Sequence, residues 1–170
     1  MPGQVLNYVE AHDNYNLNDL MHHLHPHDSP ENIEKRIYLA NALNLTMQGM
    51  CFMQLGQEFQ RSKMVATGKD GNYTEADVKR AMNSYNAPDE VNRVDWNQVT
   101  LKKELVDKIA KLIERKKTVA EFSYRSYADI YDNLYVTKAD FASGIVELHI
   151  SGKLDETLVF DNMKKDLEIY

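Results

Sequence analysis

Hydrophobic positions in the first two thirds of the chain alternate between short runs and helical stripes. Residues 4–11 (QVLNYVEA) predict a strand, and residues 50–55 (MCFMQL) form an unbroken apolar run typical of a buried parallel strand. Between them, Ser29 as N-cap and Pro30 at the first helical position predict a helix that ends near Gly49. Its apolar stripe recurs at spacings of three and four: Ile33, Ile37, Ala40, Leu43 and Met47. After a long polar stretch, a second stripe predicts another helix: Leu101, Leu105, Ile109 and Leu112.

The pattern changes from about residue 122 onward. Residues 126–133 indicate a short helix, and residues 144–151 (GIVELHIS) alternate apolar and polar side chains as a half-buried strand does. Residues 151–153 read as a turn, residues 156–160 as a second strand, and Leu167 with Ile169 as a third. This part of the chain therefore predicts antiparallel β structure.

The order strand, helix, strand, helix before residue 120 predicts the α/β class, with a parallel sheet or barrel. In such folds, functional side chains lie on loops that follow the C-terminal ends of the strands. Two polar clusters fall at these positions, His12-Asp13-Asn14 after the first run and Gly56-Gln57-Glu58 after the second. We therefore expect both clusters at one edge of the sheet.

Composition narrows the range of functions. The 170 residues carry 20 Lys and Arg against 26 Asp and Glu, a net charge of −6, without the basic cluster that nucleic-acid binding needs. No apolar run approaches the ~18 residues of a membrane span, and the start MPGQVLNYVE lacks the features of a signal peptide. The single cysteine, Cys51, fits a reducing compartment. These features predict a soluble, cytoplasmic protein with neither a nucleic-acid nor a membrane partner.

Three motifs resemble a known enzyme family. Residues 7–14 (NYVEAHDN) closely resemble the fourth conserved region of glycoside hydrolase family 13, the α-amylase family. The residues match the form of this motif in bacterial type I pullulanases in particular. Residues 56–63 (GQEFQRSK) resemble the segment that follows the eighth barrel strand of those enzymes. Residues 83–89 (NSYNAPD), with Val91-Asn92 and Asp95-Trp96, are similar to a further loop of theirs. Three motifs in the right order are far more specific than any one of them.

The resemblance implies retaining hydrolysis of α-1,6-glucosidic bonds in pullulan and starch, with α-glucan as the partner molecule. Such chemistry needs a nucleophile and a general acid about 5 Å apart. Asp13 matches a third carboxylate of the family, which binds the 2- and 3-hydroxyls of the reacting glucose. His12 matches a histidine that stabilises charge in the transition state. The resemblance further implies substrate-binding roles for a second group: Asn14, Gln57, Glu58, Tyr85 and Trp96.

The resemblance covers only the end of the family's catalytic barrel. Motifs like GFRFD and GEGW, which carry the nucleophile and the general acid, do not occur in the sequence. A whole barrel takes about 250 residues. We therefore expect residues 1–120 to form the last two βα units of a (β/α)8 barrel and residues 121–170 to begin an antiparallel C-terminal β-sandwich. Such a fragment should be inactive alone and would have the N-terminal part of the barrel as its structural partner.

Plainer interpretations exist for several of these residues. Asp13 can serve as a turn residue, Glu58 can pair with Arg61 or Lys63 on a solvated loop, and Trp96 can be packing. Alternate histidines from His22 to His27 suggest a metal site, but an exposed loop is the favoured interpretation. No metal or cofactor is predicted for this chain, and calcium in a parent enzyme is left open. Cys51 is predicted to be a buried packing residue. At the level of the whole chain, the alternatives to an enzyme fragment are a non-catalytic carbohydrate-binding module and a structural remnant that binds missing barrel strands.

Overall fold

The computed structural model describes all residues, 1–170, as a mixed α/β chain with two sheets. The chain divides into two compact units: one formed by residues 1–8, 38–52 and 108–170, the other by residues 9–37 and 53–107. The helices are α1 (Leu17–Leu24), α2 (Pro30–Thr46), α3 (Glu75–Met82), α4 (Asp89–Asn92), α5 (Asn97–Leu101), α6 (Lys103–Thr118) and α7 (Tyr127–Asn133). The strands are β1 (Leu6–Asn7), β2 (Met50–Cys51), β3 (Leu134–Asp140), β4 (Ile145–Ile150), β5 (Glu156–Asp161) and β6 (Asp166–Ile169). Short 3₁₀ turns are η1 (Pro2–Gln4), η2 (Gln57–Phe59), η3 (Lys69–Gly71) and η4 (Ala120–Phe122).

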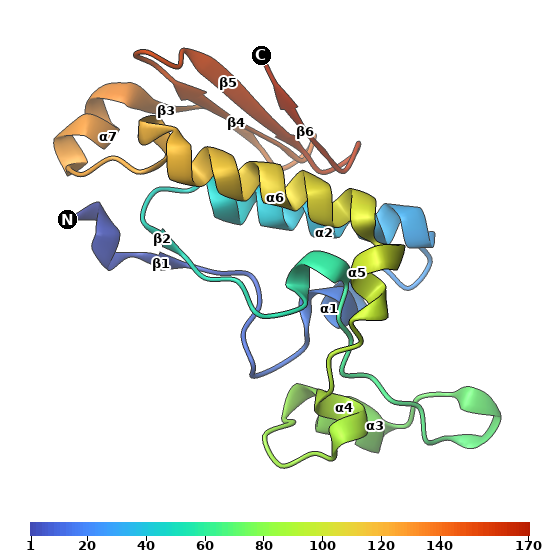
Figure 1. The fold of residues 1–170 in the computed structure, drawn as a ribbon. Helices are drawn as coiled ribbons and strands as arrows, with labels where there is room; N and C mark the ends of the chain where they lie inside the picture. Colours follow the sequence, from blue (N-terminus) through green and yellow to red (C-terminus); the bar gives the residue numbers. More distant parts are fainter. The chain divides into compact units, whose positions relative to one another are not determined.

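The larger sheet is antiparallel, with strand order β3-β4-β5-β6 (Figure 1). This confirms the predicted antiparallel structure, including α7, β4, β5 and β6 near their expected positions. Its inner face buries four apolar side chains: Leu148, Ile150, Leu158 and Phe160. Val146, predicted on the same face, is 36% exposed. Strand β3 was not predicted because Tyr135 and Val136 are both exposed, so the strand shows no clear alternation of apolar and polar positions.

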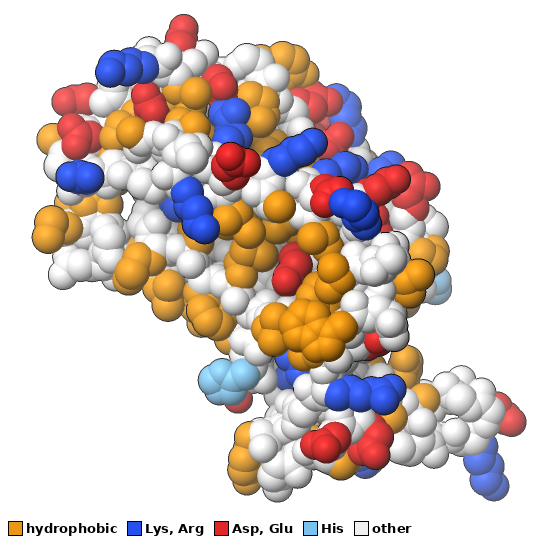
Figure 2. Space-filling view, in the orientation of Figure 1, with side chains coloured by type: hydrophobic (Ala, Val, Ile, Leu, Met, Phe, Trp, Pro, Cys, Tyr) orange, Lys and Arg blue, Asp and Glu red, His pale blue; other side chains and the backbone are white.

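The smaller sheet pairs β1 with β2 in parallel, Leu6 opposite Met50 and Asn7 opposite Cys51. The parallel pairing confirms the prediction, but each strand has only two residues. The expected burial of the second run was wrong, since Met50 is 52% and Phe52 39% exposed. With only one neighbouring strand each, these strands leave their apolar side chains on the surface, and Figure 2 shows hydrophobic side chains gathered there.

Helix α2 begins as predicted, because the Ser29 hydroxyl accepts a hydrogen bond from the Asn32 N–H at 3.2 Å. The first half of the predicted stripe is confirmed, with Ile33 and Ile37 fully buried. The second half was wrong: Leu43 is 39% exposed, Ala40 and Met47 are half-buried, and the buried positions are Asn41, Ala42, Asn44, Leu45 and Thr46.

Contacts with β2 explain this change of face along α2. The Asn44 side chain donates to the Phe52 carbonyl at 3.1 Å, and the Cys51 thiol donates to the Asn44 carbonyl at 2.9 Å. The Asn44 side chain can be buried here because Phe52, directly after β2, accepts its hydrogen bond, and the buried Thr46 hydroxyl donates to the Ala42 carbonyl of its own helix. Cys51 is half-buried, and burial raises the pKa of its thiol, as expected for a packing residue.

The second predicted helix is divided at Lys102 into α5 and α6. Leu105, Ile109 and Leu112 are buried as predicted. Leu101 is 71% exposed, so its inclusion in the stripe was wrong. The backbone at Lys102 departs from helical dihedrals, with φ of −107° and ψ of 25°, so the spacing extrapolated from α6 does not apply to Leu101.

Three helices lie in stretches that the hydrophobic pattern left as loop: α1, α3 and α4. Helix α3 is started by a capping box, in which Thr74 Oγ1 accepts from the Asp77 N–H and Asp77 Oδ2 accepts from the Thr74 N–H. Asp77 also accepts from the N–H and the hydroxyl of Thr67. The hydrogen bond from the Thr74 N–H, together with those from Thr67, holds the pKa of the Asp77 carboxyl well below its usual range. The Thr-x-x-Asp pattern was the available sequence signal for this helix. No helix of the chain combines the length and the apolar character that a bilayer crossing requires.

Candidate functional site

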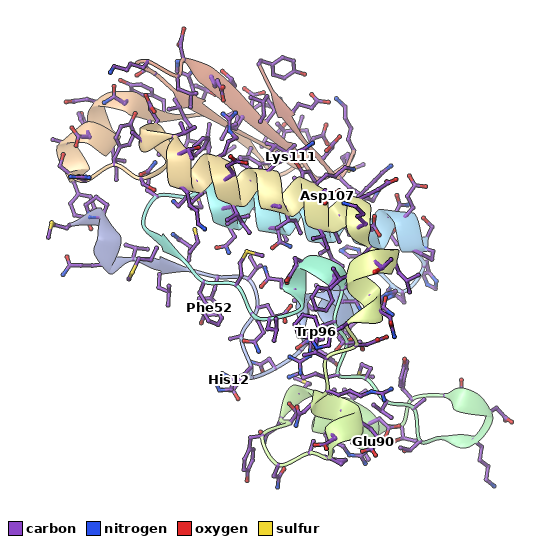
Figure 3. The ribbon with its side chains drawn as sticks, in the orientation of Figure 1. His12, Phe52, Glu90, Trp96, Asp107 and Lys111 are labelled. Atoms are coloured by element: carbon purple, nitrogen blue, oxygen red, sulfur yellow. The ribbon has the colours of Figure 1, made fainter.

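The loop that follows β1 presents His12 and Asp13 to solvent. Their side chains are 78% and 70% exposed, and His12 Nε2 lies 3.5 Å from Asp13 Oδ2. Figure 3 shows His12 at the outer end of this loop, pointing away from the ribbon. Asn14, also exposed, adopts the left-handed backbone conformation with φ of 64°. Asn is one of the few residues that take this conformation readily, and it turns the chain sharply after Asp13.

Beneath the exposed side chains, the backbone of this loop is held by Lys63. The Lys63 ammonium donates to the carbonyl oxygen of His12 at 2.9 Å and to that of Asn14 at 2.7 Å. Lys63 is only 3% exposed. The lysine therefore lies under the loop and contacts the peptide groups on both sides of Asp13.

Three further hydrogen bonds anchor the same segment. The Asn14 N–H donates to the Met82 carbonyl at 2.8 Å. The Glu10 carboxylate accepts from the Leu17 N–H at 2.8 Å, at the start of α1. The Asn16 side chain donates to the Arg61 carbonyl at 3.2 Å. Exposed polar side chains on a backbone fixed from below form an arrangement suited to binding a polar ligand.

Buried charged groups surround this anchor. Burial raises the pKa of the Glu10 carboxyl to about 7, against its ordinary 4.5, and Glu10 Oε1 is buried without a hydrogen-bond partner. Burial also raises the pKa of Asp19 and lowers that of the Lys63 ammonium. Asp19 Oδ2 accepts from the Lys63 N–H at 2.9 Å, and Asp19 Oδ1 accepts from the Ser62 hydroxyl at 2.5 Å. The burial of Glu10 and Asp19 could not be predicted, because nothing in the local sequence pattern shows that a carboxylate will be buried.

The second polar cluster forms a tight turn after β2. Gly56 has φ of +98°, and a Cβ there would lie 2.5 Å from the Arg61 Cβ, so a side chain is excluded at this position. Gln57 is 1% exposed and its Oε1 accepts from the Gln54 N–H at 3.3 Å. Glu58 Oε2 accepts from the Gly56 N–H at 3.1 Å. The proposed roles of these two side chains in substrate binding remain predictions.

The alternative that Glu58 pairs with Arg61 or Lys63 on a solvated loop was wrong for the lysine, which is buried beneath His12 and Asn14. The Arg61 guanidinium donates instead to the Asn92 carbonyl at 2.5 Å. Cations in this segment therefore bind backbone carbonyls and connect three loops. Because β1 and β2 are parallel, the loops that follow them leave from the same edge of the small sheet. This arrangement brings His12 and Lys63 together.

Two aromatic side chains of the third motif lie on the surface. Tyr85 is 81% exposed in a turn held by the Asn92 side chain, which donates to the Ser84 and Ala87 carbonyls. Trp96 is 62% exposed, and its ring centroid lies 6.0 Å from that of the buried Phe59 (Figure 3). One face of each ring is therefore accessible to a sugar, although no contact joins either ring to His12 or Asp13.

The histidine run forms the expected loop only in its second half, where His25 and His27 follow α1. His22 and His23 lie in the last turn of α1, where both side chains are exposed, and the His23 ring stacks on Tyr15 at a centroid distance of 5.2 Å. No group of three or more His, Cys, Asp or Glu side chains in the chain is arranged to hold a metal ion. A cavity of about 470 Å³ lies beside α1, and its lining includes Tyr15, Asp19 and Tyr73. The sequence carries no local signal for this cavity, because its walls come from three separated segments, residues 15–23, 62–64 and 73–78.

Comparison with known proteins identifies the relatives of this chain. A pullulanase of Bacillus subtilis (strain 168) is 35% identical over 133 residues, which are 78% of this chain and 16% of that protein. The crystal structure of the Anoxybacillus sp. LM18-11 pullulanase complexed with maltotetraose matches 95% of this chain and 22% of its own, with 33% identity and a TM-score of 0.77. The chain is homologous to part of the pullulanases, in glycoside hydrolase family 13.

Other pullulanases agree with this result. The type I pullulanase of B. subtilis complexed with maltose matches 95% of this chain and 21% of its own, with 29% identity and a TM-score of 0.79. Pullulanase A of Streptococcus pneumoniae is 27% identical over 175 residues, covering 85% of this chain and 14% of that protein. No protein-family model matches the chain. The chain spans about a sixth of the length of these curated pullulanases, and it aligns with them as a mixed α/β segment.

Proposed function

We propose that this chain is a fragment of a retaining debranching hydrolase that acts on α-1,6-glucosidic bonds of pullulan or starch. In this proposal, residues 1–120 supply the last two βα units of a (β/α)8 barrel, and residues 121–170 supply part of a C-terminal β-sandwich. Asp13 binds hydroxyls of the reacting glucose, and His12 donates a hydrogen bond to the same sugar that stabilises the charge developing toward the transition state. The nucleophile and the general acid belong to a part of the enzyme outside this chain.

One observation carries this proposal: His12 and Asp13 stand exposed, side by side, on a loop whose backbone is anchored from below. The parallel pairing of β1 and β2 across α2 supports the barrel assignment, since parallel strands joined by a helix are the repeating unit of that fold. Malto-oligosaccharides bound to homologous pullulanases support an α-glucan as the ligand.

The first test is made on the purified chain with maltotetraose and with pullulan. We expect no release of reducing ends from pullulan, because both remaining catalytic groups are missing, but measurable binding of maltotetraose by titration calorimetry. Asp13→Asn should weaken that binding by roughly 10- to 100-fold, the effect of losing hydrogen bonds to a charged acceptor. Glu104→Gln, an exposed carboxylate on α6, is the matched control and should change nothing. Reducing ends released by the chain would show that it contains a complete catalytic pair.

A second candidate function is structural, and the exposed surface of the small sheet favours it. Five apolar side chains around β1 and β2 are at least 39% exposed: Val5, Leu6, Tyr8, Met50 and Phe52. Both strands have one unpaired edge, which in soluble proteins is normally covered or paired. In this second candidate, the chain complements the other strands of such a barrel, supplied by a separate polypeptide.

Size-exclusion chromatography with light scattering tests the structural candidate. We expect the wild-type chain to self-associate through its apolar edge, and Leu6→Lys to shift it toward the monomer. Val136→Lys, which also places a lysine at an exposed strand position, is the control. A wild-type chain that stays monomeric at high concentration would speak against exposed edges as its functional feature.

A further inference from the structure

We propose that Lys63 is a positioning residue that sets the orientation of Asp13 by holding the two peptide groups that flank it. This inference rests on the proposed function, in which Asp13 binds the reacting sugar. It adds a residue to that site which touches no substrate, and it assigns a role to the last residue of the second motif.

The contact geometry places a single ammonium under both carbonyls. Lys63 Nζ lies 2.9 Å from the His12 oxygen and 2.7 Å from the Asn14 oxygen. A lysine ammonium has three donors, so two are used here on residues i and i+2 of one turn. The left-handed conformation of Asn14 makes this turn, in which the two carbonyls converge below the loop while the Asp13 side chain points outward.

The Asp13 side chain itself has few contacts that could fix it in place. Its side chain is 70% exposed, and the neighbouring His12 side chain, 3.5 Å away, is 78% exposed. The Lys63 charge also acts on the Asp13 carboxylate from beneath. Side-chain packing contributes little to the orientation of Asp13, and the direction of its Cα–Cβ bond depends on the backbone. That backbone is held by Lys63 on both sides and by the bond from the Asn14 N–H to Met82.

The lysine is itself held at two points. Its N–H donates to Asp19 Oδ2 at 2.9 Å, and the preceding Ser62 hydroxyl donates to Asp19 Oδ1 at 2.5 Å. Asp19 belongs to α1, so the loop after β2 is fastened to this helix directly beneath the loop after β1. Burial of a cation is unfavourable unless it is well bonded, and an apolar side chain would suffice for packing alone. A buried lysine with both carbonyls as acceptors is explained by a requirement for a rigid turn.

The test compares Lys63→Met, which removes the donors at nearly constant size, with Lys63→Arg, which restores them. Lys69→Met, at an exposed lysine of the same segment, is the control. The first readout is the ¹⁵N relaxation of residues 12–14 by NMR, and the second is maltotetraose affinity. We expect Lys63→Met to mobilise residues 12–14 and to weaken binding at least 10-fold. Lys63→Arg should recover order in the turn and most of the affinity.

A double-mutant comparison separates positioning from a general structural role. If Lys63 acts through Asp13, Lys63→Met should add little further loss of affinity in the Asp13→Asn background. Additive losses, or residues 12–14 that stay as ordered in Lys63→Met as in the wild type, would overturn the proposal. Should Lys63→Met unfold, Asp19→Asn replaces it, with the same expected mobility of the turn. A wild-type chain that binds no maltotetraose would refute the proposed function, while the relaxation data would still decide the role of Lys63.

Discussion

Leu105→Ala is expected to lower the free energy of unfolding by about 2–5 kcal/mol, whereas Leu101→Ala should change it by no more than about 0.5 kcal/mol. The two leucines are four residues apart and belong to the same predicted stripe in the sequence. Leu105 is 2% exposed, so its truncation removes buried apolar surface and leaves a cavity. Leu101 is 71% exposed at the end of α5, and its side chain has little contact to lose.

Urea denaturation followed by circular dichroism measures both changes. The comparison is well matched because residue type, substitution and neighbourhood in the sequence are the same. Equal losses for the two variants would contradict the break between α5 and α6 at Lys102, since a continuous helix would bury both side chains. A small loss at Leu105 alone would mean that the core around it is loosely packed.

Glu10→Gln is expected to stabilise the chain relative to wild type at pH 8, and this advantage should disappear toward pH 4.5. In the folded state, burial raises the pKa of Glu10 from 4.5 to about 7. Between these values folding takes up a proton, so wild-type stability from this group is full below about 4.5 and falls as pH rises through 7. The difference between the folded and unfolded pKa values of Glu10 corresponds to about 3 kcal/mol in the free energy of unfolding. Glutamine is never charged, and its carbonyl can still accept from the Leu17 N–H.

Unfolding free energies of the two proteins at pH 4.5, 6 and 8 test this prediction. The difference, variant minus wild type, should increase by about 3 kcal/mol across the range. Glu104→Gln, which alters an exposed glutamate, should give a flat difference. A flat result for Glu10→Gln would mean that Arg61 and Lys63, whose charges lower the Glu10 pKa, outweigh its burial. A decrease with rising pH would contradict the raised pKa altogether.

The candidate site shows which contacts residue patterns in the sequence can predict and which they cannot. The motif around Asp13 and the motif ending at Lys63 were both found in the sequence, and the order of strands placed them at one edge. The contact between them was not predicted, because Lys63 in sequence resembles any surface lysine. Its burial follows from where Asp19 fastens the loop, and Asp19 lies 44 positions away along the chain.

The sequence by itself determined the features that depend on neighbouring residues. The Ser29-Pro30 start of α2, the early stripe of Ile33 and Ile37, the antiparallel tail and the family resemblance follow from local spacing and from motifs of adjacent residues. Caps, turns and alternation involve groups a few residues apart, so their physics can be read along the chain.

Only the tertiary structure decided which faces are covered. Leu43 and Met50 are apolar and exposed, while Asn44, Glu10 and Lys63 are polar or charged and buried. Whether a side chain is buried depends on what packs over it, and whether a buried charge is tolerated depends on distant donors and acceptors. For Lys63 those partners are far away in sequence, since the carbonyls of His12 and Asn14 lie 51 and 49 positions from it. Asn44 and Glu10 bond to the backbone of Phe52 and Leu17, only 8 and 7 positions away but outside the local pattern of their own segment.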